Sequence, residues 1–169
     1  METLEAIHTR RSVRKYRDEP VSERDIHTLL EAAMTAPSAG NAQPWHFLVL
    51  TDKELLATVS TLSPYMGMAG QAPLAVLVCG DTSLEKYPGF WVQDCSAALQ
   101  NLMLAARDLG LGSVWTGIYP VEERILSFKR TFSLPETIIP LGLVVLGHTE
   151  APGKRESRFK AERAHRNSW

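Results

Sequence analysis

The stretch LAVLVCG, residues 74–80, is apolar at every position before its final glycine. A continuous apolar run of this length is typical of a strand that is covered on both faces, because a strand with one face in water alternates apolar and polar residues. A second run of this kind, IIPLGLVVLG, occupies residues 138–147. The two runs predict buried strands of a central sheet with helices packed outside it.

Helices and shorter strands are predicted around these two runs. HFLVLT at residues 46–51 and part of GLGSVWTG at residues 110–117 are strand candidates. Between Phe90 and Leu109 the apolar residues have helical spacing and cover most of the circumference, which predicts a buried helix. The predicted helices are residues 3–9, 22–36 capped by Ser22, 52–62 capped by Asp52, 90–109, and 120–132 begun by Pro120. Strands and helices in this order predict an α+β fold.

Composition is that of an ordinary globular protein, since 44% of the 169 residues are hydrophobic and 22% are charged. Disorder, collagen and coiled coil are excluded, and the length predicts one domain over residues 1–169, with residues 150–169 as a basic tail. Cys79 and Cys95 have neither the density of a secreted disulfide scaffold nor the spacing of a zinc site, so we expect a cytoplasmic protein. No apolar segment approaches the roughly 20 residues that span a bilayer, and we expect no membrane association.

Charge is concentrated at the two ends of the chain. Residues 1–17 and residues 150–169 each carry a net charge of +3, whereas the whole chain carries −1. The near-neutral total argues against a nucleic-acid partner. The two basic ends either converge to hold one phosphorylated small molecule or are simply solvated termini, and charge alone favours the second interpretation.

Several common catalytic and binding motifs are missing from the sequence. GLGSVW begins like a dinucleotide-binding fingerprint, but Trp115 stands where the third glycine belongs. Phosphate-binding loops of the Walker type, HExxH, GxSxG and paired CxxC motifs do not occur. The five histidines are scattered without a His or Cys partner at metal spacing, so we predict no metal site.

Three segments carry a positive signal: RRSVRKY at residues 10–16, PSAGNAQPWHFLVL at residues 37–50, and GLGSVWTG followed by a basic tail that ends in RNSW. Together they resemble the FMN-dependent nitroreductase family, in its short, single-domain, NAD(P)H-dependent form. The resemblance spans nearly the whole chain in the same order. It implies a central mixed, mainly antiparallel sheet flanked by helices, and an intertwined homodimer with FMN at the subunit interface.

The first segment has side chains that suit both ends of FMN. Arg10 and Arg11 match the phosphate dianion because a guanidinium group pairs with phosphate oxygens two at a time, and Ser12 adds a donor. Arg14 is expected near N1 and O2 of the flavin, where negative charge develops on reduction. The alternative is that these arginines only decorate a surface.

The resemblance implies further contacts to FMN from other parts of the chain. Thr116 and Gly117 stand where the family presents backbone N–H groups to N5 and O4 of the flavin, and Gln71 is a candidate donor on the pyrimidine side. In the tail, Arg158 is the first candidate and Arg155 the second for closing on the phosphate. The loop that is expected to reach the flavin of the partner subunit contributes Pro37, Ser38, Ala39 and Asn41.

We therefore expect an FMN-dependent oxidoreductase that transfers hydride from NADH or NADPH through flavin N5 to nitroaromatic, quinone or similar conjugated acceptors by a ping-pong mechanism. Such chemistry needs no catalytic acid or base from the protein, which agrees with the missing triads and metal clusters. One alternative is a flavin-binding or storage protein with little turnover. Another is a specialised relative that dehalogenates its substrate or fragments a flavin, and a third, without flavin, is a structural dimer whose basic ends meet an acidic partner.

Overall fold

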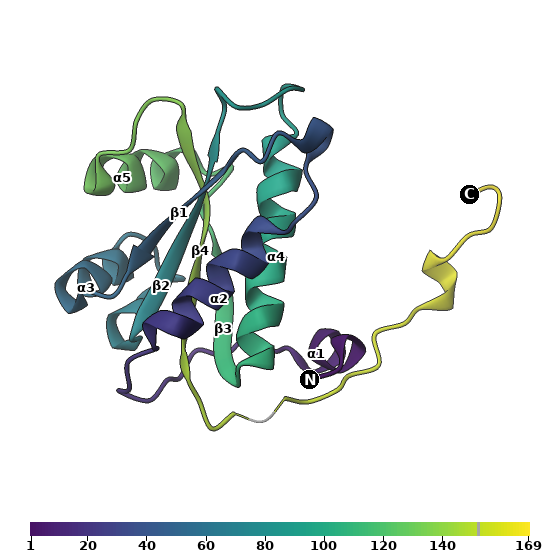
Figure 1. Ribbon diagram of the computed structural model, residues 1–169, viewed down its shortest axis with the longest axis horizontal. Coiled ribbons are helices and arrows are strands. Elements are labelled where there is room, and N and C mark those ends of the chain that lie inside the picture. Colours follow the sequence, from purple (N-terminus) through teal and green to yellow (C-terminus); the bar gives the residue numbers. More distant parts are fainter. Residues whose placement is uncertain (152) are drawn as a thin grey trace.

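The structure is a computed structural model that describes residues 1–151 and 153–169. Its central sheet has the strand order β1-β2-β4-β3, and every neighbouring pair is antiparallel (Figure 1). The strands are β1 (Trp45–Leu50), β2 (Leu74–Asp81), β3 (Leu111–Gly117) and β4 (Ile138–His148). The two apolar runs that predicted central strands are therefore β2 and β4, the inner pair of the sheet.

The helices also follow the sequence pattern closely. Ser22 accepts a hydrogen bond from the Asp25 N–H and Asp52 accepts from the first N–H groups of its helix, so both predicted caps are confirmed. The prediction that Pro120 begins a helix is wrong: the Val121 N–H donates to the Ile118 carbonyl, which places Pro120 in a turn before the helix. The helices are α1 (Thr3–Thr9), α2 (Glu23–Met34), α3 (Lys53–Thr61), α4 (Trp91–Asp108) and α5 (Glu122–Phe132), with 3₁₀ helices η1 (Ala39–Asn41), η2 (Gly67–Gln71) and η3 (Ala161–Arg163).

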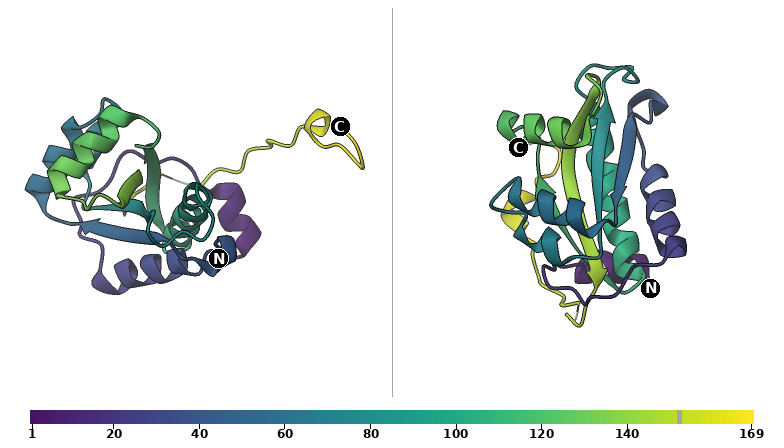
Figure 2. Two further views of the ribbon diagram at one scale, coloured as in Figure 1. Left: turned by 90° about the horizontal axis from the view of Figure 1, so that it is seen from above. Right: turned by 90° about the vertical axis from the view of Figure 1, so that its left-hand side faces the viewer.

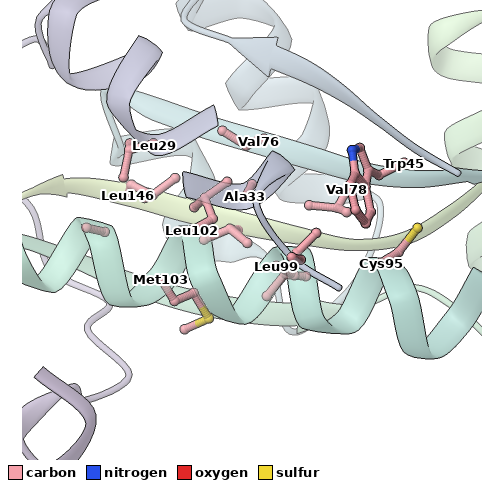
Figure 3. Packing of buried hydrophobic residues seen from close by; sticks show 14 of the residues in the cluster. Leu29, Ala33, Trp45, Val76, Val78, Cys95, Leu99, Leu102, Met103 and Leu146 are labelled. Atoms are coloured by element: carbon pink, nitrogen blue, oxygen red, sulfur yellow. The ribbon is translucent and has the colours of Figure 1, made fainter. Parts of the chain in front are cut away.

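Helices cover both faces of the sheet, with α2 and α4 on one side and α3 and α5 on the other (Figure 1). Strand β2 contributes to both cores because its side chains alternate: Val76 and Val78 pack towards α2 and α4, whereas Ala75 and Leu77 pack on the opposite face. Figure 3 shows the first of these cores, in which residues of α2 and α4 interlock over the sheet. The expectation of a doubly covered strand is confirmed.

Helix α4 has more buried residues than the other described α-helices, and its cysteine behaves as a packing residue. Cys95 and Cys79 of β2 are both buried and free of disulfide, and the Cys95 thiol lies 3.5 Å from the Cys79 carbonyl oxygen. Burial raises the pKa of each thiol to about 12, which keeps both protonated at neutral pH. Both cysteines therefore behave as small apolar residues of the core.

The basic segment after α1 is fixed against the open edge of β3. Ser12 forms a parallel bridge with Ser113, and the Val13 N–H donates to the Ser113 carbonyl at 2.9 Å. Gly112 makes this approach possible, since a Cβ at that position would lie 2.7 Å from a Val13 methyl carbon. The four strands of the sheet are all antiparallel to their neighbours, and this single bridge is the one parallel contact at the sheet edge in the described residues, so the expected antiparallel character is found but the sheet is not mixed.

The tail after β4 leaves the body of the protein. It passes beneath α1 and then extends outward, so that the C-terminus lies far from the sheet (Figures 1 and 2). Of the tail predicted at residues 150–169, position 152 lies outside the described residues. No helix in the described part of the chain combines the length and apolar character that crossing a membrane requires.

A substitution at Gly80 tests how tightly α4 packs on β2. A Cβ on Gly80 would lie 2.2 Å from the buried Trp91 ring, so Gly80→Ala must displace the indole or the strand. We expect a loss of about 1–3 kcal/mol in the free energy of unfolding, measured by urea denaturation. Gly67→Ala is the control, because open space surrounds that position. Equal stability of the two variants would contradict the packing described here.

Candidate functional site

The two basic ends of the chain meet in one pocket of about 590 Å³. Arg10 and Arg11 approach it from the segment after α1, and Arg155 and Arg158 approach it from the tail. Ile7, His8 and Phe159 complete much of its wall. Four of the residues predicted at the phosphate end of a ligand therefore converge, although they are separated by about 145 positions in the sequence.

The cations in this pocket are incompletely neutralised. Arg10 has a buried Nη1 that makes no hydrogen bond within the described chain. Its pKa is lowered by burial first and then by the nearby charges of Arg158 and Arg11. A buried donor without a partner costs about 1–3 kcal/mol, so an anion that accepted from Arg10 would relieve both the desolvation and the repulsion.

One carboxylate already competes for these arginines. Glu156 lies 2.6 Å from Arg11 and 3.2 Å from Arg158, and hydrogen bonds from these two side chains lower its pKa. Both ion pairs are substantially exposed and contribute little stability. The carboxylate therefore occupies part of the space between the guanidinium groups in the way that a weak anionic ligand does.

A second pocket, of about 690 Å³, lies at the other end of the same basic segment. Arg14 lines it together with Thr116 and Gly117 at the end of β3. Tyr65 and Trp115 provide aromatic walls, and the remaining lining residues are Pro64, Gly67, Met68 and Arg124. The segment from Arg10 to Arg14 thus reaches both pockets, with the exposed Ser12 between them.

The open edge of β3 decides which backbone groups face this second pocket. The Ser113 carbonyl points away from β4 because it accepts from Val13, and so does the Gly117 carbonyl, which accepts from Arg124 at 3.0 Å. Backbone groups alternate along an antiparallel strand, so the N–H of Gly117 also points outward whereas that of Thr116 points to β4. The Thr116 hydroxyl is itself buried and donates to the Leu143 carbonyl. Of the two predicted donors, the geometry favours Gly117.

The proline- and glycine-rich loop is an ordered structure with unusual backbone angles. Gly40, Asn41 and Gln43 all have positive φ, at 60°, 54° and 48°, which is rare outside glycine and is often found at functional sites. Three side chains hold it. The Gln43 N–H donates to the Ser38 hydroxyl, the Ala39 N–H donates to the buried carboxylate of Asp94 at 3.0 Å, and the Lys86 ammonium group donates to the Gly40 carbonyl. The loop is therefore anchored at the N-terminal end of α4.

The structure does not bring every predicted residue to the two pockets. Within one protomer Pro37, Ser38, Ala39 and Asn41 line neither of them. Gln71 is exposed and lines a different pocket, beside Tyr16 and Leu56, because η2 turns it towards α3. This geometry does not support Gln71 as a ligand in the second pocket, where its neighbours Gly67 and Met68 lie instead.

Three residues of the site carried little or no functional signal in the sequence. Asp94 lies within the apolar pattern of the predicted helix at residues 90–109, where nothing in the sequence marks it as a support for the loop at residues 37–41. Arg124 follows two glutamates in the first turn of α5, where no motif singles it out. Glu156 is an acidic residue between Arg155 and Arg158 of the basic tail, and the sequence alone does not show that it pairs with the arginines of the pocket. Each becomes apparent only when distant segments are placed side by side.

Together the two pockets suit an elongated ligand. The first provides several guanidinium groups for a dianion, and the second provides aromatic walls, one cation and outward backbone groups for a flat ring. Ser157 lines the first pocket with His8 and Glu156, but no hydrogen bond among the described residues joins this serine to either possible base. These features favour binding of a phosphorylated ring compound that brings its own reactivity.

Comparisons with known proteins agree with this description. The sequence matches the family model described as "Nitroreductase family" over residues 7–67 and 63–148. It is 51% identical over 170 residues to a Methanothermobacter thermautotrophicus protein with the provisional name NADH dehydrogenase/NAD(P)H nitroreductase, covering 100% of this chain and 88% of that one.

Solved structures with the same fold extend the comparison. The crystal structure of a provisionally named NADH oxidase from Clostridium acetobutylicum aligns with a TM-score of 0.94 and 40% identity, covering 97% of this chain and 99% of that one. A provisionally named nitroreductase from Desulfovibrio desulfuricans, solved in complex with FMN, aligns with a TM-score of 0.85 and 31% identity, covering 99% and 97%.

Removal of the Asp94 carboxylate tests its role as the anchor of the loop. Asp94→Ala leaves the Ala39 N–H without its acceptor, so we expect faster hydrogen exchange at that amide and a loss of about 1–3 kcal/mol in stability. Asp94→Asn retains an acceptor oxygen and is expected to retain most of the protection. Unchanged exchange in Asp94→Ala, measured by NMR, would show that the loop is held by other contacts.

Proposed function

The chain belongs to the nitroreductase family, and from this premise we propose that it is an FMN-dependent oxidoreductase that uses NAD(P)H. The observation that carries the proposal is the cluster of Arg10, Arg11 and Arg158, in which one buried guanidinium donor has no partner among the described residues and Arg10 is destabilised as a cation. A phosphate dianion fits this cluster better than the single carboxylate of Glu156 does.

Different residues of the chain would bind the phosphate and the ring of FMN. Arg10, Arg11 and Arg158 would bind the phosphate, with Arg155 beside them and Ser12 as an additional donor on the way to the ring. Arg14 would place positive charge near N1 and O2, and the outward N–H of Gly117 would face N5 and O4. Bound FMN would supply the redox chemistry, as the carrier of a hydride between NAD(P)H and the acceptor at flavin N5.

The acceptor site is proposed on the exposed side of the second pocket. Tyr65, Met68 and Trp115 offer apolar and aromatic surface for a conjugated molecule, such as a nitroaromatic or a quinone, stacked near the flavin. Because donor and acceptor would use the same face in turn, the expected kinetics are ping-pong. The chain need contribute no acid or base for this exchange.

A homodimer is part of the same proposal. The extended tail exposes Phe159 and Trp169, and α1 exposes Leu4 and Ile7, which are apolar surfaces that a second copy could cover. The loop at residues 37–41 lies at neither pocket of its own protomer, so it would reach the flavin of the other one. The single-domain organisation, the cytoplasmic location and the absence of a nucleic-acid partner remain predictions.

The first experiment separates an enzyme from a storage protein. We expect freshly purified protein to show the absorption spectrum of a bound flavin, to release FMN on denaturation, and to bleach when NADH or NADPH is added without oxygen. Flavin that stays oxidised with both donors would support the storage alternative. A colourless protein that does not take up added FMN would contradict the whole site.

The phosphate cluster is tested by comparing FMN with riboflavin, which lacks the phosphate. Arg10→Ala removes charge-assisted hydrogen bonds of about 2 kcal/mol, so we expect FMN affinity to fall about thirtyfold while riboflavin affinity stays the same. Arg163→Ala, in the exposed tail but outside the pocket, is the matched control. An equal loss for both flavins, measured by fluorescence quenching, would assign Arg10 a structural role.

Glu156 provides the opposite test on the same pocket. Glu156→Gln removes the carboxylate that pairs with Arg11 and Arg158, so these cations become available to the ligand phosphate. We expect FMN to bind about threefold more tightly at low salt, with a smaller gain at high salt because the exposed charges are screened. Weaker FMN binding in this variant would show that Glu156 orders the tail instead of competing with the phosphate.

A further inference from the structure

Arg124 is held in a defined position at the mouth of the second pocket. It lies in the first turn of α5 and is half-buried. One of its terminal nitrogens donates to the Gly117 carbonyl at 3.0 Å, and its guanidinium carbon lies 5.2 Å from the centre of the Tyr65 ring. Contacts to β3 and to the segment before η2 therefore restrain a side chain that is otherwise flexible.

The charge of Arg124 is not balanced by a carboxylate. In the part of the chain that the structure describes, neither Arg124 nor Arg14 forms an ion pair, and the lining residues of the pocket include no Asp or Glu. The neighbouring Glu122 and Glu123 are exposed on the helix and do not line the pocket. The pocket thus combines aromatic walls with two unpaired cations.

The two cations have different neighbours. Arg14 belongs to the segment that also carries the phosphate arginines, and the proposed function assigns it to the flavin. Arg124 comes from α5 and lies against Tyr65, a residue that is 65% exposed. A guanidinium group has five N–H donors, and the structure gives Arg124 a hydrogen bond through one nitrogen only, within the described residues. The remaining donors are available for a molecule that lies against Tyr65.

We propose that Arg124 selects acceptors that carry an anionic group, such as a carboxylate attached to a nitroaromatic or quinone ring. The ring would pack between Tyr65, Met68 and Trp115 while the carboxylate accepts from the guanidinium. This inference rests on the proposed function and names the substrate class of that site. The same cation also suits a phosphate of the nicotinamide donor, so the test separates the two half-reactions.

The test uses the FMN-loaded protein and two acceptors of nearly equal shape, 4-nitrobenzoate and 4-nitrobenzamide. Arg124→Gln keeps an amide donor for the Gly117 carbonyl but removes the charge. We expect the ratio of kcat/KM for the benzoate over the benzamide to fall about tenfold, which corresponds to the loss of one charge-assisted hydrogen bond. Arg124→Lys should recover part of the ratio, and added salt should lower the ratio in the natural protein.

A binding measurement without turnover accompanies the kinetics. Calorimetry of the oxidised protein with benzoate and with benzamide should show that the natural protein prefers benzoate and that Arg124→Gln loses this preference. Arg130→Gln, on the same helix and exposed, is the control that changes net charge equally without touching the pocket. An equal change in both variants would mean that only the overall charge matters.

The outcomes separate this inference from the function on which it rests. Failure to bind FMN, or FMN that NAD(P)H does not reduce, overturns the proposed function. Normal flavin binding and reduction, with a benzoate-to-benzamide ratio that Arg124→Gln leaves unchanged, overturns the role of Arg124 alone. A slower flavin reduction by NAD(P)H with an unchanged acceptor ratio, measured by stopped flow, would assign Arg124 to the donor and would equally overturn the proposal.

Discussion

The hydrogen bond from the Val13 N–H to the Ser113 carbonyl positions the arginines that follow α1. It fixes the basic segment along an open edge of the sheet, in parallel register, so that Arg10 and Arg11 reach one pocket while Arg14 reaches the other. Gly112 permits this pairing by leaving room for the Val13 side chain. The five-residue segment from Arg10 to Arg14 thereby sets the separation of the two pockets, and under the proposed function the span of the ligand.

Clustering cations in this way opposes folding, and the rest of the molecule must supply the stability. The inner strands β2 and β4 are buried along almost their whole length, and α4 seals one face of the sheet. A rigid core of this kind can tolerate a partly buried Arg10 whose charge is unfavourable in the absence of an anion. Under the proposed function, a phosphate bound in this pocket would recover this unfavourable energy as binding energy.

The features predicted correctly from the sequence are those that depend on local pattern. The caps at Ser22 and Asp52 need only residues two or three positions away, and the buried strands and α4 follow from apolar spacing. The start of α5 was misjudged because a hydrogen bond between Ile118 and Val121 includes Pro120 in a turn. Which N–H faces outward at Thr116 or Gly117 depends on register with β4, and the position of Gln71 depends on the direction of η2. Neither the register nor this direction is encoded in adjacent residues.

The strained loop at residues 37–43 is the part whose form is least explained by one protomer. Asn41 and Gln43 have positive φ, which is unfavourable for residues with a side chain, and the buried carboxylate of Asp94 at the start of α4 helps to hold this arrangement. Backbone strain of this kind is seldom retained in a loop that only connects two secondary-structure elements. Yet the loop contributes nothing to the pockets beside β3 in its own chain. Its geometry is best accounted for if the ligand that it contacts belongs to a second copy, in which case the same interface that covers the extended tail also completes each site.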